Sequence, residues 1–398
     1  MRTFTFKGLF LTAVFMLLGC LSIQAADDNL ITKQITIKLD KAGTLPDKIG
    51  SSRKYKITNL KLIGEINGTD WEMIREMAGR DYSGGSTEGN LTVLDLSEAK
   101  IVEGGYSYYG RGYDAYYTSN DKIGDYAFCG CSGLTSLNLP ASITEIGRNA
   151  FEGCCGLTSL NLPAGITSIG DYAFYGCSGL TSLNLPTGIT EIDFATFEDC
   201  SGLTSLNLPA GITKIGGSAF SGCSGLTSLT LPAGITEIGE WTFRNCSGLT
   251  SLNLPTGITE IDHATFEGCS GLTSLNLPAS ITVIYSSAFS GCNGLASIYM
   301  YSEKVPKMGK DVFKDCDAKK CTVYVPKGTY DDYWLSDFGY YFENIVEFDA
   351  TGIDKTTTST DVEEVSRYSV NGQRLVGPTK GLNIVKYSDG SVKKVAVE

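Results

Sequence analysis

The sequence has little of what most enzymes, metalloproteins and nucleic-acid-binding proteins require. It holds one histidine in 398 residues, and 44 acidic residues outnumber 32 lysines and arginines, for a net charge of −12. Nucleic-acid binding needs a clustered basic surface, which this balance disfavours. The lone His263 leaves little for acid–base catalysis or for a histidine-ligated metal. We therefore expect a non-enzyme with no cofactor, no bound metal and no nucleic-acid partner.

The segment 1–26 predicts export. It contains two basic residues, no acidic residue and an apolar run over positions 8–21, which is typical of a secretory signal peptide. Leu17-Leu18-Gly19-Cys20 also resembles a bacterial lipobox, which would make Cys20 a lipidated first residue. We favour cleavage near Ala25, because apolar character continues past Cys20. No later apolar run is long enough to span a membrane, so we expect no transmembrane helix.

From residue 123 to residue 294 the sequence repeats with a fixed 23-residue period. Most units share a Leu-x-x-Leu-x-Leu-Pro run, two isoleucines, and a phenylalanine three residues before a cysteine. The cysteines are Cys131, Cys154, Cys177, Cys200, Cys223, Cys246, Cys269 and Cys292. The phenylalanines are Phe128, Phe151, Phe174, Phe197, Phe220, Phe243, Phe266 and Phe289.

This periodicity predicts a stack of similar coils. In each unit we expect a short strand at Leu-Thr-Ser-Leu-Asn-Leu, a turn at the proline, and a return segment that ends at the phenylalanine. One unit cannot cover its own apolar face, whereas stacked units can. The predicted fold class is an α/β repeat solenoid with short parallel strands, end caps and a small all-β C-terminal module. The cysteines are expected to form a buried ladder, because parallel side chains hold their Cβ atoms too far apart for disulfides.

The repeat resembles the leucine-rich repeat, and specifically the 23-residue BspA-like subclass of surface proteins. The period, the leucine run, Ile-Gly and Ala-Phe-x-x-Cys recur together over nearly half of the chain. One departure is that serine or glycine stands where the common pattern has asparagine or cysteine after the strand, as at Ser142 and Gly165. The resemblance implies an adhesin that binds host or community surface proteins, matrix glycoproteins such as fibronectin and fibrinogen among them.

Composition shifts divide the chain into six segments. The predicted segments are a signal peptide (1–26), an N-terminal cap with a degenerate first repeat (27–122), seven to eight regular repeats (123–297), a C-terminal cap (298–350), a linker (351–365) and a β-rich module (366–398). In the N-terminal cap we expect strands at 34–39 and 55–62 and a helix at 70–77 with Asp70 as its N-cap. In the C-terminal cap, Cys316 and Cys321 lie outside the expected cysteine ladder and are a candidate disulfide.

The C-terminal module carries two hairpin signals, Asn371-Gly372 and Asp389-Gly390. Its Tyr-Ser-Val-Asn-Gly-Gln-Arg and Lys-Gly-Leu-Asn-Ile-Val segments resemble the C-terminal sorting domain of the type IX secretion system of Bacteroidetes. That resemblance implies passage through the outer membrane, followed by surface attachment or release. The expected location is extracellular or at the outer-membrane surface.

Candidate binding residues are those that differ between units, because core positions must repeat. Variation concentrates between the second isoleucine and the cysteine of each unit. Several of the variable residues are aromatic residues or arginines, which are the types that anchor protein interfaces. These candidates are Arg148, Tyr172, Tyr175, Phe194, Trp241, Arg244 and His263. An equally weighted interpretation is that they only cap the convex rim.

The expected strand face offers a second candidate surface, because its small uncharged residues hardly vary. Its asparagines are Asn138, Asn161, Asn184, Asn207, Asn253 and Asn276. We favour a purely structural role for this row, with glycan binding as the alternative function. A third interpretation is an envelope scaffold with no soluble ligand.

The array also has a longer period and a strong charge. The segment Thr187–Asp193 recurs three units later at Thr256–Asp262, which indicates growth by duplication of a three-unit block. The stretch 123–297 holds 13 acidic and three basic residues. We therefore expect an acidic solenoid surface.

Overall fold

A computed structural model describes residues 29–317, 319–350, 364–369, 374–375, 380–387 and 392–397. The predictions of a signal peptide, of lipidation at Cys20 and of the two turn dipeptides fall outside these residues, as does most of the expected linker. The chain divides after Phe348 into two compact units. Each unit is described by itself.

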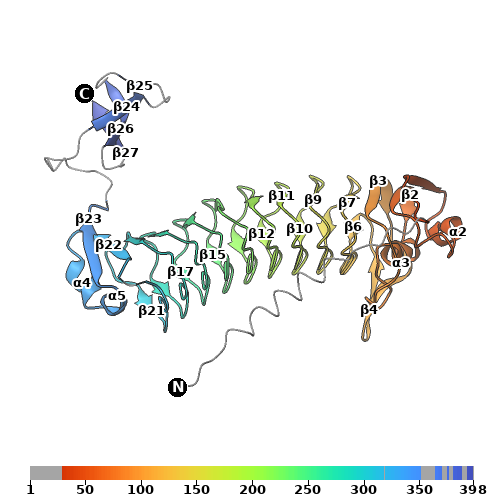
Figure 1. Cartoon of the computed structure of the whole chain (residues 1–398), viewed down its shortest axis with the longest axis horizontal. Helices are drawn as coiled ribbons and strands as arrows, with labels where there is room; N and C mark the ends of the chain where they lie inside the picture. The colour runs from red at the N-terminus through yellow and green to blue at the C-terminus, as the bar shows by residue number, and fades with distance from the viewer. Residues whose placement is uncertain are drawn as a thin grey trace. The chain divides into compact units, whose positions relative to one another are not determined.

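The N-terminal cap is an α/β layer whose strands continue into the repeats (Figure 1). Its elements are β1 (Ile35–Leu39), α2 (Leu45–Ile49), β2 (Asn59–Ile66), α3 (Gly68–Met77) and β3 (Val93–Ile101). The three strands pair in parallel, and β3 then pairs with β7 (Ser136–Asn138), the strand of the first regular repeat. The cap therefore extends the sheet of the array and buries its first coil.

Helix α3 begins earlier than the sequence indicates. Asn67 is the N-cap and accepts a hydrogen bond from the Thr69 N–H (3.1 Å), while Asp70 accepts one from the Asn67 N–H (3.0 Å). The prediction of Asp70 as N-cap is wrong, because Asp70 supplies the other half of a capping box. Its buried carboxylate also accepts the N–H groups of Gly43 (2.6 Å) and Leu45 (2.8 Å), which fixes the start of α2 against α3.

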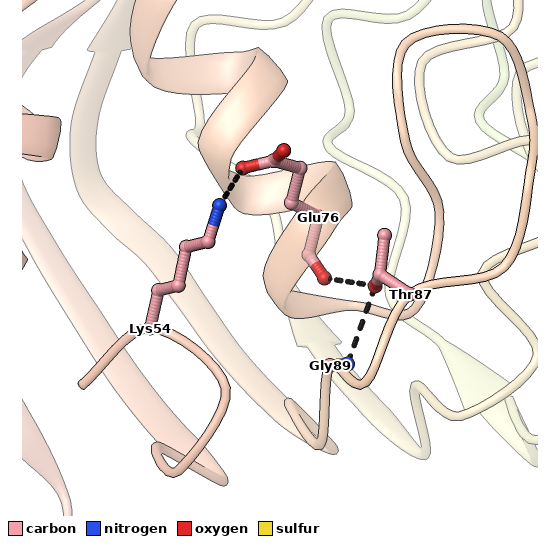
Figure 2. Close-up of polar contacts among 4 residues, drawn as sticks. All are labelled: Lys54, Glu76, Thr87 and Gly89. Atoms are coloured by element: carbon pink, nitrogen blue, oxygen red, sulfur yellow. Dashed lines mark hydrogen bonds and ion pairs between the residues drawn. The ribbon is translucent and has the colours of Figure 1, made fainter. Parts of the chain in front are cut away.

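The last turn of α3 is tied to two neighbouring loops (Figure 2). The Lys54 ammonium lies 2.6 Å from the Glu76 carboxylate, and the Thr87 hydroxyl donates to the Glu76 carbonyl oxygen at 2.6 Å. The Gly89 N–H donates to the Thr87 hydroxyl oxygen at 3.2 Å. A Cβ at position 89 would collide with the Glu76 carbonyl oxygen, so this close passage requires glycine.

The tyrosine-rich stretch before the array forms an antiparallel hairpin of β4 (Gly104–Arg111) and β5 (Asp114–Thr118). Tyr109 of this hairpin stacks on Tyr126 of the first coil, with ring centroids 5.0 Å apart. The hairpin therefore belongs to the cap that covers the first coil.

Two series of short parallel strands run along the array. The second series has one strand in each coil, whereas the first has none at positions 228–230, where Ser228 forms only an isolated bridge. The first series comprises β7, β9 (Ser159–Leu160), β11 (Ser182–Asn184), β13 (Ser205–Asn207), β16 (Ser251–Asn253), β18 (Ser274–Leu277) and β20 (Ser297–Met300). The second comprises β6 (Lys122–Ile123), β8 (Glu145–Ile146), β10 (Ser168–Ile169), β12 (Glu191–Ile192), β14 (Lys214–Ile215), β15 (Glu237–Ile238), β17 (Glu260–Ile261), β19 (Val283–Ile284) and β21 (Lys307–Met308). We call the outward side of the first series the strand face, and the stretch from the second-series isoleucine to the next cysteine the return segment.

The predicted solenoid and its interior ladders are confirmed. Phenylalanine rings stack from Phe128 to Phe313 with neighbouring centroids 5.2–5.6 Å apart and planes within 11° of parallel. Each buried cysteine thiol from Cys154 to Cys292 donates to the carbonyl of the phenylalanine one coil earlier, at 3.0–3.2 Å. Burial raises the pKa of these thiols, for example Cys200, well above the ordinary value, so they stay protonated donors.

Cys316 and Cys321 correct one expectation. Both are free thiols in the structure, where the sequence had suggested a disulfide. The Cys316 thiol donates to the Phe289 carbonyl at 3.2 Å, so this residue extends the ladder that was expected to end at Cys292. Phe313 and Cys316 keep the spacing of the repeat, and one inserted residue sets them off the 23-residue period.

The C-terminal cap closes the other end of the array. It consists of β22 (Thr322–Pro326), α4 (Tyr330–Trp334), α5 (Asp337–Tyr341) and β23 (Asn344–Phe348). Strands β22 and β23 extend the first series in parallel, and the ring of Phe313 ends the ladder against Phe338 and Phe342, at 5.7 and 5.0 Å.

The C-terminal unit is an antiparallel sheet of order β25-β24-β26-β27, as the all-β prediction requires. Its strands are β24 (Glu364–Ser369), β25 (Arg374–Leu375), β26 (Gly381–Tyr387) and β27 (Val392–Val397). The Arg367 guanidinium donates to the Asn383 side-chain oxygen at 3.2 Å in its interior. Over the described parts of both units, no helix has the length and apolarity to cross a membrane.

Candidate functional site

The return segment presents its variable side chains from a strained and fixed backbone. The residue five positions before each ladder cysteine is left-handed in every coil, with φ between 50° and 59°, and is never glycine. These residues are Tyr126, Asn149, Tyr172, Ala195, Ser218, Trp241, Ala264, Ser287 and Asp311. Outside glycine this conformation costs roughly 1–2 kcal/mol. Bonds between coils hold it, since the N–H of Tyr172 donates to the Phe194 carbonyl (3.0 Å) and that of Trp241 to the His263 carbonyl (2.9 Å).

Four of the seven predicted return-segment residues meet in one cluster, which we call the Tyr172 group. The ring of Tyr172 contacts Tyr175 and Phe194 edge to face, with centroids 5.9 and 5.4 Å apart. The Arg148 guanidinium lies 5.9 Å from the centroid of the Tyr172 ring. Arg148 is exposed, Phe194 is 37% exposed, and both tyrosines are half-buried. Three successive coils thus build one aromatic surface with a cation beside it.

The other three predicted residues lie apart from that group. Trp241 meets His263 edge to face at 5.8 Å, and the Arg244 guanidinium lies 2.9 Å from the Glu267 carboxylate. The coil between the two clusters carries only Gly217, Ser218 and Ser221 at the matching positions. Arg244 is therefore already paired with a carboxylate of the chain, whereas Arg148 lies beside an aromatic ring.

Several carboxylates lie beside the Tyr172 group. Burial raises the pKa of Asp193 above its ordinary value, and the charges of Asp171 and Glu191 raise it further. Burial also raises the pKa values of Glu198 and Asp199. The aromatic surface therefore lies in a region of negative potential.

The strand face, the alternative candidate, satisfies part of its polarity internally. The Asn207 amide donates to the Asn184 side-chain oxygen at 3.4 Å, and Asn276 does the same to Asn253 at 3.3 Å. Threonine hydroxyls one coil apart bond to threonine carbonyls, as Thr204 does to Thr181 at 3.1 Å. These bonds are those expected of a structural row, and Asn138, Asn161, Asn184, Asn207 and Asn253 are all exposed.

An aromatic surface that the sequence did not predict lies at the C-terminal end of the strand face. Tyr299 pairs in register with Asn276 and with Tyr324, and the two tyrosine rings stack 4.5 Å apart. Phe348 meets both edge to face, at 5.8 and 6.5 Å, and Tyr301 at 5.4 Å. Aligning the asparagine row through the irregular last repeats could have revealed it, because tyrosine simply replaces asparagine there.

No group of three or more histidine, cysteine, aspartate or glutamate side chains in the described residues is arranged to hold a metal ion. The ladder cysteines lie in the interior, and their thiols, as in Cys177, donate to carbonyls.

Three solved structures illustrate what this chain is similar to. A T. pallidum leucine-rich repeat protein is 30% identical and covers 47% of this chain and 76% of its own, with a TM-score of 0.35. A leucine-rich repeat protein from Bacteroides ovatus is 20% identical over 79% of this chain and 92% of its own (TM-score 0.31). A leucine rich cell surface protein from Faecalibacterium prausnitzii is 22% identical over 75% and 89% (TM-score 0.35).

No curated protein matches the chain. The family model of the BspA type leucine rich repeat region matches residues 116–227 and 214–329, which together span more than half of the sequence. The 23-residue period and the parallel coils agree with that match. The chain belongs to the BspA-type leucine-rich repeat family.

Proposed function

We propose that this chain is an exported cell-surface protein that binds other proteins through the Tyr172 group. The observation that carries the proposal is the convergence of Arg148, Tyr172, Tyr175 and Phe194 from three coils into one partly exposed cluster. Each stands at a position that the repeat leaves free to vary. Aromatic residues and arginine are the types that most often anchor protein interfaces.

The rigidity of the site favours binding. Tyr172 and Phe194 sit on backbone that is bonded to the neighbouring coil, so little conformational entropy is lost when a partner docks. The flanking carboxylates favour a partner with basic residues beside its apolar contact. A non-enzymatic role fits this surface, because its functional positions are contacts and not acid–base pairs.

The export features support a surface location. The N-terminal residues resemble a signal peptide, and the C-terminal module resembles a type IX sorting domain. Two similar structures are described as those of a leucine rich cell surface protein and of the pneumococcal vaccine antigen PcpA. An exported protein of this kind meets host or community surface proteins, matrix glycoproteins such as fibronectin and fibrinogen among them.

Binding of the full chain to immobilised fibronectin and fibrinogen tests the proposal. The repeat supplies compatible substitutions: Tyr172→Asn copies Asn149, and Phe194→Gly copies Gly217, each at the same position of a neighbouring coil. We expect the double variant to lose about tenfold or more in affinity. Ser287→Asn, at the Tyr172 position of a distant coil, is the matched control and should bind normally. Unchanged binding by the double variant would refute the assignment of this surface.

A further inference from the structure

We call the junction between the strand-face segments of two successive coils a seam. One seam is open, which means that no strand pairing crosses it. Strand β11 pairs with β13 and β16 pairs with β18, yet no strand pairing joins β13 to the following coil at positions 228–230. In the adjoining coils, Thr204 N–H donates to the Thr181 carbonyl at 3.0 Å and Thr250 N–H to the Thr227 carbonyl at 3.2 Å. Among the described contacts no equivalent bond links the Thr227 N–H to Thr204. The Thr158 N–H also lacks this bond to Thr135, but there a bridge between Asn138 and Asn161 joins the two coils.

Neighbouring seams of the first series keep at least one bridge. Asn138 pairs with Asn161 between β7 and β9, and Ser228 pairs with Ser251 on the far side of the open coil. The segment at 228–230 is therefore attached to the coil that follows it. The opening lies on its other side, toward β13.

The two coils that flank the opening remain joined elsewhere. In the second series Lys214 and Ile215 pair with Glu237 and Ile238, and in the return segment the Ser218 N–H donates to the Glu240 carbonyl at 2.9 Å. The opening is therefore local to the strand face. Its walls are held at a fixed separation by the bonds behind them, so the gap is preformed.

A hollow of about 530 Å³ lies at this seam, within the range of small-ligand sites. Its polar lining consists of Ser205, Asn207, Ser228 and Thr230, and its apolar lining includes Ala210 and Pro232. Thr230 stands where the other regular repeats have asparagine, so the amide row that joins Asn207 to Asn184 stops here. The hollow thus coincides with the one irregularity in the asparagine row of the regular repeats.

The chemistry of the lining selects an uncharged, hydroxyl-rich ligand. The segments 201–209 and 224–232, which form the two walls, contain no charged side chain. They offer hydroxyls, a side-chain amide and backbone groups whose usual inter-coil partners are absent. Unpaired backbone groups require water or a ligand to complete their hydrogen bonds. Binding of an anion is disfavoured because the array carries 13 acidic and three basic residues. Binding of a cation is disfavoured because the lining contains no carboxylate.

We propose that the open seam between Asn207 and Thr230 is a binding site for an uncharged oligosaccharide. Sugar hydroxyls replace the missing inter-coil hydrogen bonds at Thr227 and along β13, and the side chains of Asn207 and Thr230 flank the ring. This site lies on the strand face and does not depend on protein binding by the Tyr172 group.

Titration calorimetry of the full chain tests the ligand class with cellohexaose, maltohexaose and laminarihexaose as neutral probes and a hyaluronan hexasaccharide as the anionic probe. We expect saturable binding of at least one neutral probe and none of hyaluronan. No binding of any neutral probe, or preference for hyaluronan, overturns the proposal.

Matched substitutions test the location. Thr230→Asn continues the amide row into the hollow, and Ser228→Gln places a longer side chain across it. Both positions are exposed, so folding is preserved. Each substitution should lower the affinity for the neutral probe by about tenfold, which corresponds to about 1.4 kcal/mol of binding free energy. The controls lie at the closed β11–β13 seam: Asn184→Thr is the reverse of Thr230→Asn, and Ser182→Gln is the equivalent of Ser228→Gln. Both control variants should keep an affinity for the neutral probe within twofold of that of the parent chain. An equal loss in both pairs overturns the assignment to this seam.

Amide hydrogen exchange reports on the seam directly. In the free chain the Thr227 amide should exchange much faster than the Thr250 amide, which is bonded to the preceding coil. The neutral probe should slow Thr227 and leave Thr250 unchanged. If Thr227 is already as protected as Thr250 without ligand, the seam is closed and the site does not exist.

Discussion

The two sides of each coil follow opposite rules. On the strand face the same serine, leucine and asparagine recur in nearly every repeat, whereas the return segment accepts glycine, aspartate, phenylalanine and histidine at a single position, as at Gly217, Asp171, Phe194 and His263. On both sides backbone hydrogen bonds join successive coils, except at the open seam of the strand face. On the return side those bonds fix the direction of a side chain without constraining its identity, because the side chain points away from the stack.

This difference explains where function can evolve in such an array. A new side chain on the return segment alters the surface and leaves the interior ladders intact, as the aromatic Tyr172 group does. A change on the strand face alters a row of contacts between coils, and the single replacement at Thr230 accompanies an open seam. In the regular repeats, variation therefore adds contacts on the return segment, whereas at Thr230 on the strand face it accompanies a gap.

The largest expected effect comes from the interior that both sides share. Phe220 is fully buried and stacks on Phe197 and Phe243, with centroids 5.6 Å away on each side. Phe220→Ala should lower the free energy of unfolding by about 3–5 kcal/mol, because it leaves a cavity in a continuous ladder. Urea denaturation followed by circular dichroism measures it. Phe194→Ala, on the exposed return segment, is the control and should cost well under half as much; comparable losses would mean that the return side is part of the core.

A second expected effect concerns the closeness of the coils. A Cβ at Gly216 would lie 2.8 Å from the Asp193 carbonyl carbon, and the Gly216 N–H donates to the Ile192 carbonyl at 2.7 Å. Gly216→Ala should therefore destabilise the chain by roughly 1–3 kcal/mol, because the coils must separate and weaken that bond. At Gly211 the nearest atom to an added Cβ is 3.8 Å away, so Gly211→Ala should change the urea midpoint little. If both variants behave alike, coil spacing is not what glycine provides.

A third, smaller effect tests the strain in the return segment. Ala264 is buried with φ of 50°, at the position that is left-handed in every coil. Ala264→Gly should raise stability by up to about 1 kcal/mol, because glycine adopts this conformation without a steric penalty. Ala288, one position later in the next coil, lies outside the left-handed set, and Ala288→Gly should instead lower stability. Equal and negative changes at both positions would argue against strain at Ala264.

Much of this architecture is readable in the sequence, because the 23-residue period leaves few ways to bury its apolar positions. The phenylalanine and cysteine ladders follow from that period, and the α/β cap was partly visible in its strands. The boundary of α3 was misplaced, since Asp70 forms a capping box through a backbone contact that composition does not reveal. The repeat spacing at Cys316 is recognisable, but one residue inserted after Cys292 favours placing it outside the ladder, and only its hydrogen bond to the Phe289 carbonyl shows that it belongs there.

The candidate site was predicted as a set of positions and not as a surface. The period places Arg148, Tyr172 and Phe194 on consecutive coils, but only their side-chain directions decide that they meet while Trp241 lies with His263. The open seam had no clear signal in the sequence beyond Thr230. Its existence depends on hydrogen bonds that fail to form between two nearly identical segments.

The smallest expected effect is the pH dependence of the carboxylates beside the Tyr172 group. Burial raises the pKa of Asp199 above its ordinary value of about 3.9, so the folded chain binds this proton more tightly than the unfolded chain. The ionised form is therefore destabilising at neutral pH, and stability at this site rises as pH falls through the raised pKa. Asp199→Asn, which copies Asn245 in a later coil with the same left-handed backbone, should be more stable than the parent chain at pH 7. The advantage should vanish near pH 4, as urea midpoints of both chains across pH 4–7 would show. An advantage that persists unchanged to pH 4 would mean that packing, and not the charge of Asp199, separates the two.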